Sequence, residues 1–425
     1  MNFLKTDDLS ISLTSIFVKM IGLWKPTNHS ERYIRNVTLT YTLIAILFAL
    51  WVETRDLYYS WGDFDTCLFN ICNLLSVIMP LLKLGVLFVH QDDFFHLVAY
   101  TKQKFLYGNY NNDERKIVFD CKRQCSYFVC FLTVSTLATV VSYIVPPIVA
   151  NIGRNESDRI LPFNMWLDLP LAMTPYFEIT FIIQALAVYH VGVSYCCFDN
   201  FLCIMNLHVA TQFRILQRRL ASINDSMNEE TPVKDKIPIK DSTHFEDKSY
   251  HAFKHYIREH QALIAYCEKL EEVFNTIVLG QLLMFSMLMC LDGYHILLPN
   301  GSFSKRLIFS FHLSACLCQL LMFTYSCDCI IRESMSTAEA VYSAPWTILS
   351  MNTSGKMIRK DLILIIMRSS VPCCLTAKGF FIVSLETYTK ILSTAVSYFT
   401  LLRNQPEERS RHSLTPNMDD HRNIK

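Results

Sequence analysis

The chain has 425 residues, of which 51% are hydrophobic and 18% are charged, and its mean hydropathy is +0.24. A soluble protein of this length needs about 25% charged residues to cover its surface, so the composition indicates that lipid covers part of the chain. The formal net charge of +1 shows no global basic bias, which argues against a nucleic-acid partner.

The N-terminal region does not resemble a signal peptide. Asp7 and Asp8 come early, and Lys19 and Gly22 interrupt the apolar stretch that follows; a cleaved signal has a basic start and an unbroken apolar segment. We therefore expect the first true span to act as the insertion signal.

Seven stretches are long and apolar enough to cross a bilayer core of roughly 30 Å, which needs about 20 residues of helix. They cover Tyr33–Val52, Cys67–His90, Ser126–Val149, Pro175–Asn206, Val273–Leu298, Lys305–Ile331 and Gly379–Leu402. The fourth is too long for a simple span, so we expect its second half to continue as a helix beyond the membrane. The predicted fold is an all-α membrane protein with seven transmembrane helices.

Basic residues outside these stretches lie mostly on one side. The N-terminal segment and loops two, four and six carry 27 Lys and Arg, against 10 on the other side. Positive residues favour the cytoplasm, so we predict a cytoplasmic N-terminus and an extracellular C-terminus. This orientation is opposite to that of G-protein-coupled receptors. Among six N-x-S/T sequons, Asn155 is the best glycosylation candidate because it falls in a predicted extracellular loop away from the membrane.

The sixteen cysteines do not form a recognisable metal framework. Many lie inside apolar runs, and pairs such as Cys196–Cys197 and Cys373–Cys374 are adjacent. None shows CxxC spacing with distant Cys or His partners, so we interpret them as small apolar residues and predict no metal and no cofactor. Phosphate-binding glycine loops, HExxH and GxSxG are also absent from the sequence, which argues against an enzyme.

The last predicted span is the most polar of the seven. Glu386 and Lys390 are spaced i, i+4 and can pair on one helix face, and Ser393, Ser397 and Leu401 share a face at the same spacing. A pore lining with a hydrophobic constriction needs such a half-polar helix ending in leucine. The alternative is a helix buried among neighbours with its hydroxyls bonded to the backbone.

Three motifs, in order, resemble those of insect odorant receptors. They are Gly22-Leu-Trp24 near the N-terminus, Ala340-Val-Tyr-Ser-Ala-Pro-Trp346 at the start of loop six, and Ser397-Tyr-Phe-Thr-Leu-Leu402 with Ser384-Leu-Glu-Thr387 upstream. The similarity extends over nearly the whole chain in length, span count and loop pattern, and the last third carries most of its specificity.

The resemblance implies a ligand-gated cation channel that is a heterotetramer with a shared odorant co-receptor. It implies a last helix that lines the pore, a cytoplasmic anchor between subunits and a plasma-membrane location in the dendrites of olfactory neurons. The implied pore residues are Glu386, Lys390, Ser393, Ser397, Leu401 and Asn404, and the implied anchor residues are Tyr342 and Trp346.

On this basis the chain divides into seven parts. They are a cytoplasmic N-terminal segment (1–32), spans one to four with the ligand-binding part (33–206), a cytoplasmic loop with helical flanks (207–272), spans five and six (273–331), a cytoplasmic loop with the anchor helix (332–378), the pore-lining span (379–402) and an extracellular tail (403–425). Lys390 and the length of loop four differ from the co-receptor, so we expect a ligand-tuning subunit.

The resemblance places an odorant pocket in the outer half of the membrane among spans two, three, four and six. Depth along each span gives as candidates Phe69, Asn73, Val77, Thr136, Thr139, Tyr143, Tyr176, Thr180, Ile183, Phe309, His312 and Leu313. Such a pocket would hold a small, mainly apolar volatile. A gustatory-type channel of the same fold remains an alternative, and a G-protein-coupled receptor or a transporter is a weaker one because their motifs and repeats are missing.

Overall fold

The computed structural model describes residues 9–167, 169–221, 242–297, 303–344 and 353–413. At the ends of some helices the structure describes the backbone but not the side chains. In the last helix this applies to the residues after 401. Within this part the chain is helical, and no strand longer than a single bridge pair occurs.

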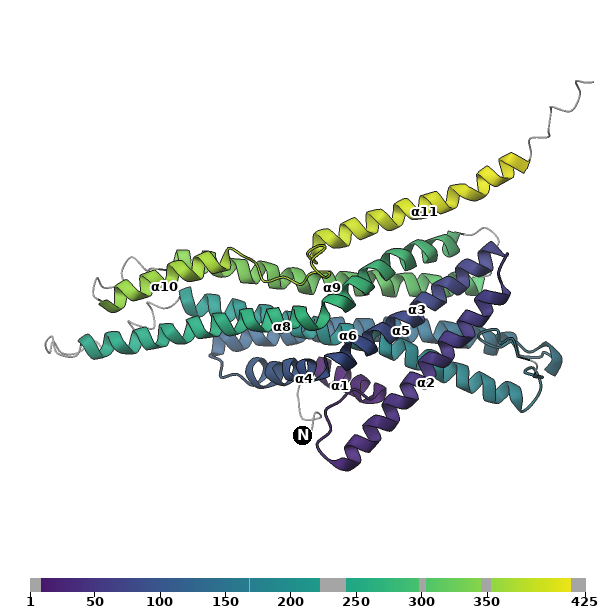
Figure 1. The fold of residues 1–425 in the computed structure, drawn as a ribbon, viewed down its shortest axis with the longest axis horizontal. Coiled ribbons are helices and arrows are strands. Elements are labelled where there is room, and N and C mark those ends of the chain that lie inside the picture. Colours follow the sequence, from purple (N-terminus) through teal and green to yellow (C-terminus); the bar gives the residue numbers. More distant parts are fainter. Residues whose placement is uncertain (1–8, 168, 222–241, 298–302, 345–352, 414–425) are drawn as a thin grey trace, which may run out of the picture.

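Long helices form one elongated bundle (Figure 1). The helices are α1 (Leu9–Ile21), α2 (His29–Tyr59), α3 (Phe64–Val89), α4 (Gln91–Tyr100) followed by a π-helical turn (Thr101–Leu106), α5 (Asn112–Ala150), a 3₁₀ turn (Glu156–Asp158), α6 (Tyr176–Ala221), α8 (Ser242–Leu297), α9 (Phe303–Ser343), α10 (Thr353–Ser369) and α11 (Leu385–Ser413). The core lies between α3, α6, α8 and α9, and the second half of α6 is its most buried part.

Six of the described helices are long and apolar enough to cross a membrane: α2, α3, α5, α6, α8 and α9. Large apolar side chains such as Ile44, Phe131, Val141 and Ile182 are exposed on their outer faces. A continuous apolar exterior of this kind fits a lipid environment. The predicted all-α membrane fold is therefore correct, and each of the first six predicted spans coincides with part of one of these helices. His90 and Pro175 lie one residue outside their helices, and Leu298 lies outside the described residues.

The seventh predicted span begins later than expected. Residues 379–384 are not helical, and α11 starts at Leu385 rather than at Gly379. Lys378 and Gly379 both have positive φ, and Thr376 pairs with Ile382 in an antiparallel bridge. A helix cannot start within a turn that contains left-handed residues, so this turn delays α11. The seven-span count and the direction of the termini remain expectations.

α11 lies along one side of the bundle, against α8 and α9 (Figure 1). Its residues Tyr388, Ile391, Leu392 and Ala395 pack against the core. Its hydroxyl groups bond largely to its own backbone: the Thr394 hydroxyl donates to the Lys390 carbonyl over 2.8 Å, and the Ser397 hydroxyl donates to the Ser393 carbonyl over 2.8 Å. The opposite face is left exposed.

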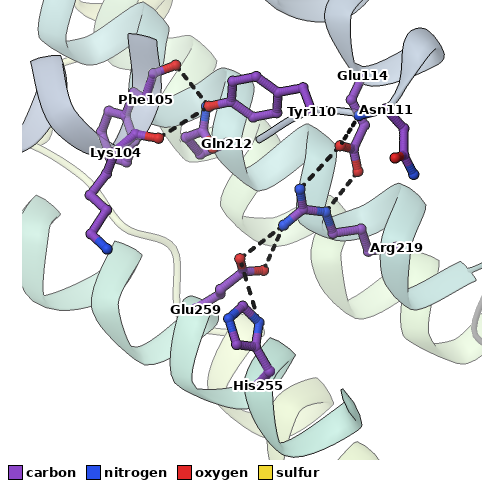
Figure 2. Close-up of polar contacts among 9 residues, drawn as sticks. All are labelled: Lys104, Phe105, Tyr110, Asn111, Glu114, Gln212, Arg219, His255 and Glu259. Atoms are coloured by element: carbon purple, nitrogen blue, oxygen red, sulfur yellow. Dashed lines mark hydrogen bonds and ion pairs between the residues drawn. The ribbon is translucent and has the colours of Figure 1, made fainter. Parts of the chain in front are cut away.

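One end of the bundle is closed by a charged cluster that joins three helices (Figure 2). The Arg219 guanidinium of α6 donates to Glu114 of α5 over 2.7 Å and to Glu259 of α8 over 2.8 Å. The Asn111 backbone amide donates to the Glu114 carboxylate over 3.0 Å, which caps the start of α5. This arrangement fixes the relative positions of α5, α6 and α8.

Glu114 lies in the first turn of α5 and precedes the predicted span Ser126–Val149 by 12 residues. Burial raises the pKa of the Glu114 carboxyl, but hydrogen bonds from Arg219 and from the Asn111 amide outweigh it and hold the pKa below its ordinary value. Nearby, burial raises the pKa of the Tyr110 hydroxyl to about 12, against the effect of a hydrogen bond from Gln212.

We expect Arg219→Ala to destabilise the bundle, since it leaves two carboxylates close together without their cation. Hydrogen bonds to charged groups contribute about 1.5–3 kcal/mol each, so the melting temperature in detergent should fall by several degrees. Because the folded pKa of Glu114 is lowered, its stabilising effect is present above about pH 4.3 and is lost as the pH falls, so the difference between wild type and variant should shrink on acidification.

Arg123→Ala is the matched control, because Arg123 pairs with Asp120 on the exposed surface of α5 and such pairs contribute little. An equal fall in melting temperature for both variants would contradict a specific role for the Arg219 cluster.

Candidate functional site

A cavity lies within the bundle between α2, α3, α5, α6 and α9. Its wall is mostly apolar, with a few polar groups from each helix. The lining residues are Phe48, Ala49, Val52 and Glu53 of α2, Asn73, Ser76 and Val77 of α3, Thr136, Thr139, Val140 and Tyr143 of α5, Gln184, Ala187, Val188, Val191, Gly192 and Tyr195 of α6, His312, Ala315, Cys316 and Gln319 of α9, and Phe163 from the α5–α6 connection.

The cavity has a volume of about 120 Å³. One water molecule needs about 10–15 Å³ of such space, so the cavity has room for a ligand of roughly ten heavy atoms. Small-molecule sites typically combine an apolar wall with a few fixed polar groups. The cavity has both features.

The connection between α5 and α6 covers one end of the cavity. The Phe163 backbone amide donates to the Gln184 side-chain oxygen over 3.0 Å, and the Gln184 amide nitrogen donates back to the Phe163 carbonyl over 3.0 Å. The Phe163 ring stacks on Tyr143, with 5.7 Å between centroids. Gln184 is 2% exposed, so this paired hydrogen bond fixes the cover from inside the bundle.

A second contact holds the same connection to α2. The Trp166 indole N–H donates to the Asp56 carboxylate over 3.0 Å, and its ring stacks on Tyr59 at 4.8 Å. The Arg55 guanidinium donates to the Trp166 carbonyl over 2.8 Å. The cover is thus attached to both sides of the cavity.

His312 is the cavity residue whose orientation is best determined. Its Nδ1 lies 2.9 Å from Asp292, which is fully buried, and its Nε2 lies 3.3 Å from the Ser76 hydroxyl. The Cys72 thiol also donates to Asp292, over 3.1 Å. Donor atoms of Cys72, Asp292 and His312 lie within 4.8 Å of one another, and Asp292 accepts hydrogen bonds from both of the other residues. Asp292 holds the imidazole in one orientation against the cavity.

The base of the cavity rests on a buried ion pair. Lys83 of α3 and Asp199 of α6 are 2.8 Å apart, with side chains 0% and 4% exposed. Gln281 of α8 donates to the same carboxylate over 2.9 Å, and Gln319 of α9 also bonds to it. Lys83 donates in addition to the carbonyl of Tyr195 over 3.0 Å. Tyr195 and Gln319 therefore contact both the cavity and the ion pair.

The structure brings together half of the ligand-site residues predicted from the sequence. Asn73, Val77, Thr136, Thr139, Tyr143 and His312 line the cavity. Phe69 and Phe309 instead pack edge to face at 5.6 Å in an aromatic group with His295. Leu313 packs against the main core.

On α6 the structure places the predicted ligand-site residues outside the cavity. Tyr176 and Ile183 are exposed on the outer surface, and Thr180 is half-buried outside the cavity wall. The residues that do line it are Gln184, Ala187, Val188, Val191, Gly192 and Tyr195, spaced as one face of a helix. The signal available in the sequence was Gln184, a polar residue in an apolar segment that starts this face.

The sequence analysis also missed the contribution of α2. Span one was not among the expected pocket helices, yet Phe48, Ala49, Val52 and Glu53 line the cavity. Glu53 is 4% exposed. An acid directly after an apolar span was the available signal, since intramembrane ionisable residues commonly mark functional sites.

The predicted pore residues lie along α11. Glu386 and Lys390 form the expected i, i+4 pair at 2.7 Å, with side chains 73% and 72% exposed. Leu401 is 60% exposed, and Ser393 and Ser397 are joined by a hydrogen bond. Asn404 lies in α11 but its side chain falls outside the described residues. Of the anchor residues, Tyr342 is exposed near the end of α9, and Trp346 is outside the described residues.

Gly192 allows α5 and α6 to approach each other at the cavity wall. A Cβ atom there would lie 2.8 Å from Val140 Cγ2 and 3.4 Å from Thr136 Cγ2.

We expect Gly192→Ala to lower the melting temperature, because overpacking costs about 1–3 kcal/mol. This cost exceeds the gain in helix propensity, which is about 1 kcal/mol. Gly85 in α3 has open space around it, so Gly85→Ala should be neutral or stabilising. If the two variants behave alike, the close α5–α6 contact is not a constraint.

Comparison with known proteins gives a consistent result. A sequence profile described as 7tm odorant receptor matches residues 63–396. Odorant receptor 13a of Drosophila melanogaster is 24% identical over 93% of this chain and 96% of its own length, and odorant receptor 10 of Aedes albopictus is 23% identical over 93% and 98%. The olfactory receptor OR5 of Machilis hrabei, solved in complex with eugenol, has the same fold, with a TM-score of 0.77 at 14% identity over 92% of this chain and 97% of that one. The chain therefore belongs to the 7tm odorant receptor family.

Proposed function

We propose that this chain is the ligand-tuning subunit of an odorant-gated, non-selective cation channel, which it forms together with the odorant co-receptor. The observation that carries the proposal is the mostly apolar cavity between α2, α3, α5, α6 and α9. Its size and wall suit a small volatile molecule with one or two polar groups.

Several contacts support a role for this cavity in ligand recognition. His312 is oriented by Asp292 and can exchange a hydrogen bond with a ligand. Tyr143 donates to Asn73 over 2.8 Å, and both residues face the cavity. The receptor of Machilis hrabei with the same fold was solved with eugenol, so a bound small molecule is compatible with this helix arrangement.

A route from the cavity to the channel is also part of the proposal. The cavity base contacts the Lys83–Asp199 pair through Tyr195 and Gln319, and this pair joins α3, α6, α8 and α9, the last two of which pack against α11. A ligand that fits one arrangement of these helices better shifts the equilibrium towards it. Leu401, with Asn404 next to it, is the proposed constriction on α11.

Assembly and location complete the proposal. The exposed face of α11, with Val396, Tyr398 and Leu401, would meet the other subunits around a pore, with Glu386, Lys390, Ser393 and Ser397 along it. Tyr342 and Trp346 would belong to a cytoplasmic anchor. The chain would cross the dendritic plasma membrane of olfactory neurons seven times, with an extracellular C-terminus and glycosylation at Asn155.

The direct test is whole-cell current from cells that express this chain with or without an insect odorant co-receptor, during exposure to a broad volatile panel. We expect a non-selective cation current that requires both chains. Comparable currents from this chain alone, or a response that requires a G protein, would contradict the proposal. Surface labelling of the chain in both conditions is the control for expression.

Filling the cavity should reduce the response to an active volatile. Val188 lies in the cavity wall, and Val188→Phe would occupy much of the space with its ring. We expect at least a tenfold rise in the half-maximal concentration, at equal surface expression, measured as odorant-evoked current.

Ile183→Phe is the matched control because Ile183 lies on the outer face of the same helix and is 45% exposed. Its response should equal that of the wild type. If Ile183→Phe impairs the response and Val188→Phe does not, the ligand binds outside this cavity.

A further inference from the structure

A second cluster of possible metal ligands lies away from the ligand cavity, between α5 and α6. Cys121 and Cys125 are one turn apart on α5, and His208 faces them from α6. The three residues are 6%, 1% and 0% exposed. Their donor atoms all lie within 4.8 Å of one another, although they come from helices that are far apart in sequence.

The geometry points to a binding site for one thiophilic metal ion, copper(I) or zinc(II), with Cys121, Cys125 and His208 as ligands. The Cys121 sulfur lies 3.7 Å from His208 Nδ1. Metal bonds of about 2.3 Å to sulfur and about 2.0 Å to nitrogen give a sulfur–nitrogen separation of roughly 3.5 Å at a tetrahedral angle and roughly 3.7 Å at a trigonal angle. The Cys121–His208 distance already suits an ion bound to both residues.

The donor set determines the class of ion. Two thiolates and an imidazole favour copper(I) and zinc(II) over magnesium or calcium, which prefer oxygen ligands. Three protein ligands complete a trigonal copper(I) site, and they leave zinc(II) one position for water. Neither cysteine forms a disulfide, so both sulfur atoms are available to an ion. The sequence analysis had predicted no metal, because i, i+4 cysteines with a distant histidine match no common zinc motif.

The surroundings suit a buried, stabilising ion. The cluster lies in a small apolar core, so bulk solvent does not compete with the protein ligands for the ion; the core residues besides the two cysteines are Val129, Leu132, Cys203, Ile204, Leu207 and Met322. Cys121 follows Glu114 by two helical turns, about 10 Å along α5. It lies on the side of α5 that packs against α6, where the Arg219–Glu114 pair also connects the two helices. A bound ion would link α5 to α6 at the end of the bundle that we assign to the cytoplasm, whereas both helices line the ligand cavity further along.

The test uses the full-length chain, purified in detergent under anaerobic, reducing conditions. Copper(I) is titrated in competition with bicinchoninate, and zinc(II) is titrated separately against a chromophoric chelator. We expect one equivalent of either ion to bind and to raise the melting temperature. Cys121→Ser and Cys125→Ser should each lower the affinity at least tenfold. Absence of stoichiometric binding to the wild type would overturn the site.

Two variants show where an ion binds. Cys130→Ser, at a half-buried position on the same helix outside the cluster, should bind as the wild type does. Cys72→Ser removes the other described cluster of possible ligands and should also leave binding unchanged. Unchanged binding in the Cys121→Ser/Cys125→Ser double variant, or loss of binding in Cys72→Ser, would overturn the proposal.

A measurement on the wild-type protein covers the case in which the serine variants fail to fold. X-ray absorption at the edge of the bound ion should show two sulfur neighbours and one imidazole nitrogen. A shell of oxygen atoms only, or of sulfur atoms only, would overturn the assignment. Odorant-evoked current is not part of this test, so its outcome is independent of the proposed channel function.

Discussion

Asp199 lies at the centre of the bundle, and the four core helices depend on it. A carboxylate within a membrane is tolerated only where other protein groups compensate it, and here Lys83, Gln281 and Gln319 do so from three different helices. Removing one partner of a buried pair costs about 3–5 kcal/mol. α3, α8 and α9 must therefore keep their register relative to α6.

This constraint places the ligand cavity. Of these helices, α3, α6 and α9 line the cavity together with α2 and α5, and Tyr195 and Gln319 connect its base to the ion pair. The other end is closed by the Phe163 segment, which is hydrogen-bonded to Gln184. A molecule in this cavity would contact Phe163 at one end, and at the other end Tyr195 and Gln319, which bond to the ion pair.

The polar character of α11 has a different basis from that of the core. Glu386 and Lys390 pair with each other, and the described hydroxyls of Thr394 and Ser397 bond to the backbone of α11. The bundle contributes at the start of the helix, where the Leu385 amide donates to Asp328 of α9. The hydroxyls are thus bonded to the backbone, as in the buried-helix alternative, yet one described face of the helix is exposed, and the pore lining stays a prediction.

The sequence by itself determined the helical membrane fold and the family, because hydrophobic length and local motifs are properties of contiguous residues. It also identified cavity residues such as Asn73, Tyr143 and His312, whose depth along a span follows from the rise per residue. It did not determine which face of α6 points inwards, since apolar residues occur all round a helix that contacts both lipid and protein. Only the tertiary structure decided that Gln184 rather than Ile183 faces the cavity, that α2 contributes Glu53, and that Cys121, Cys125 and His208 meet, because each of these depends on how separate helices pack.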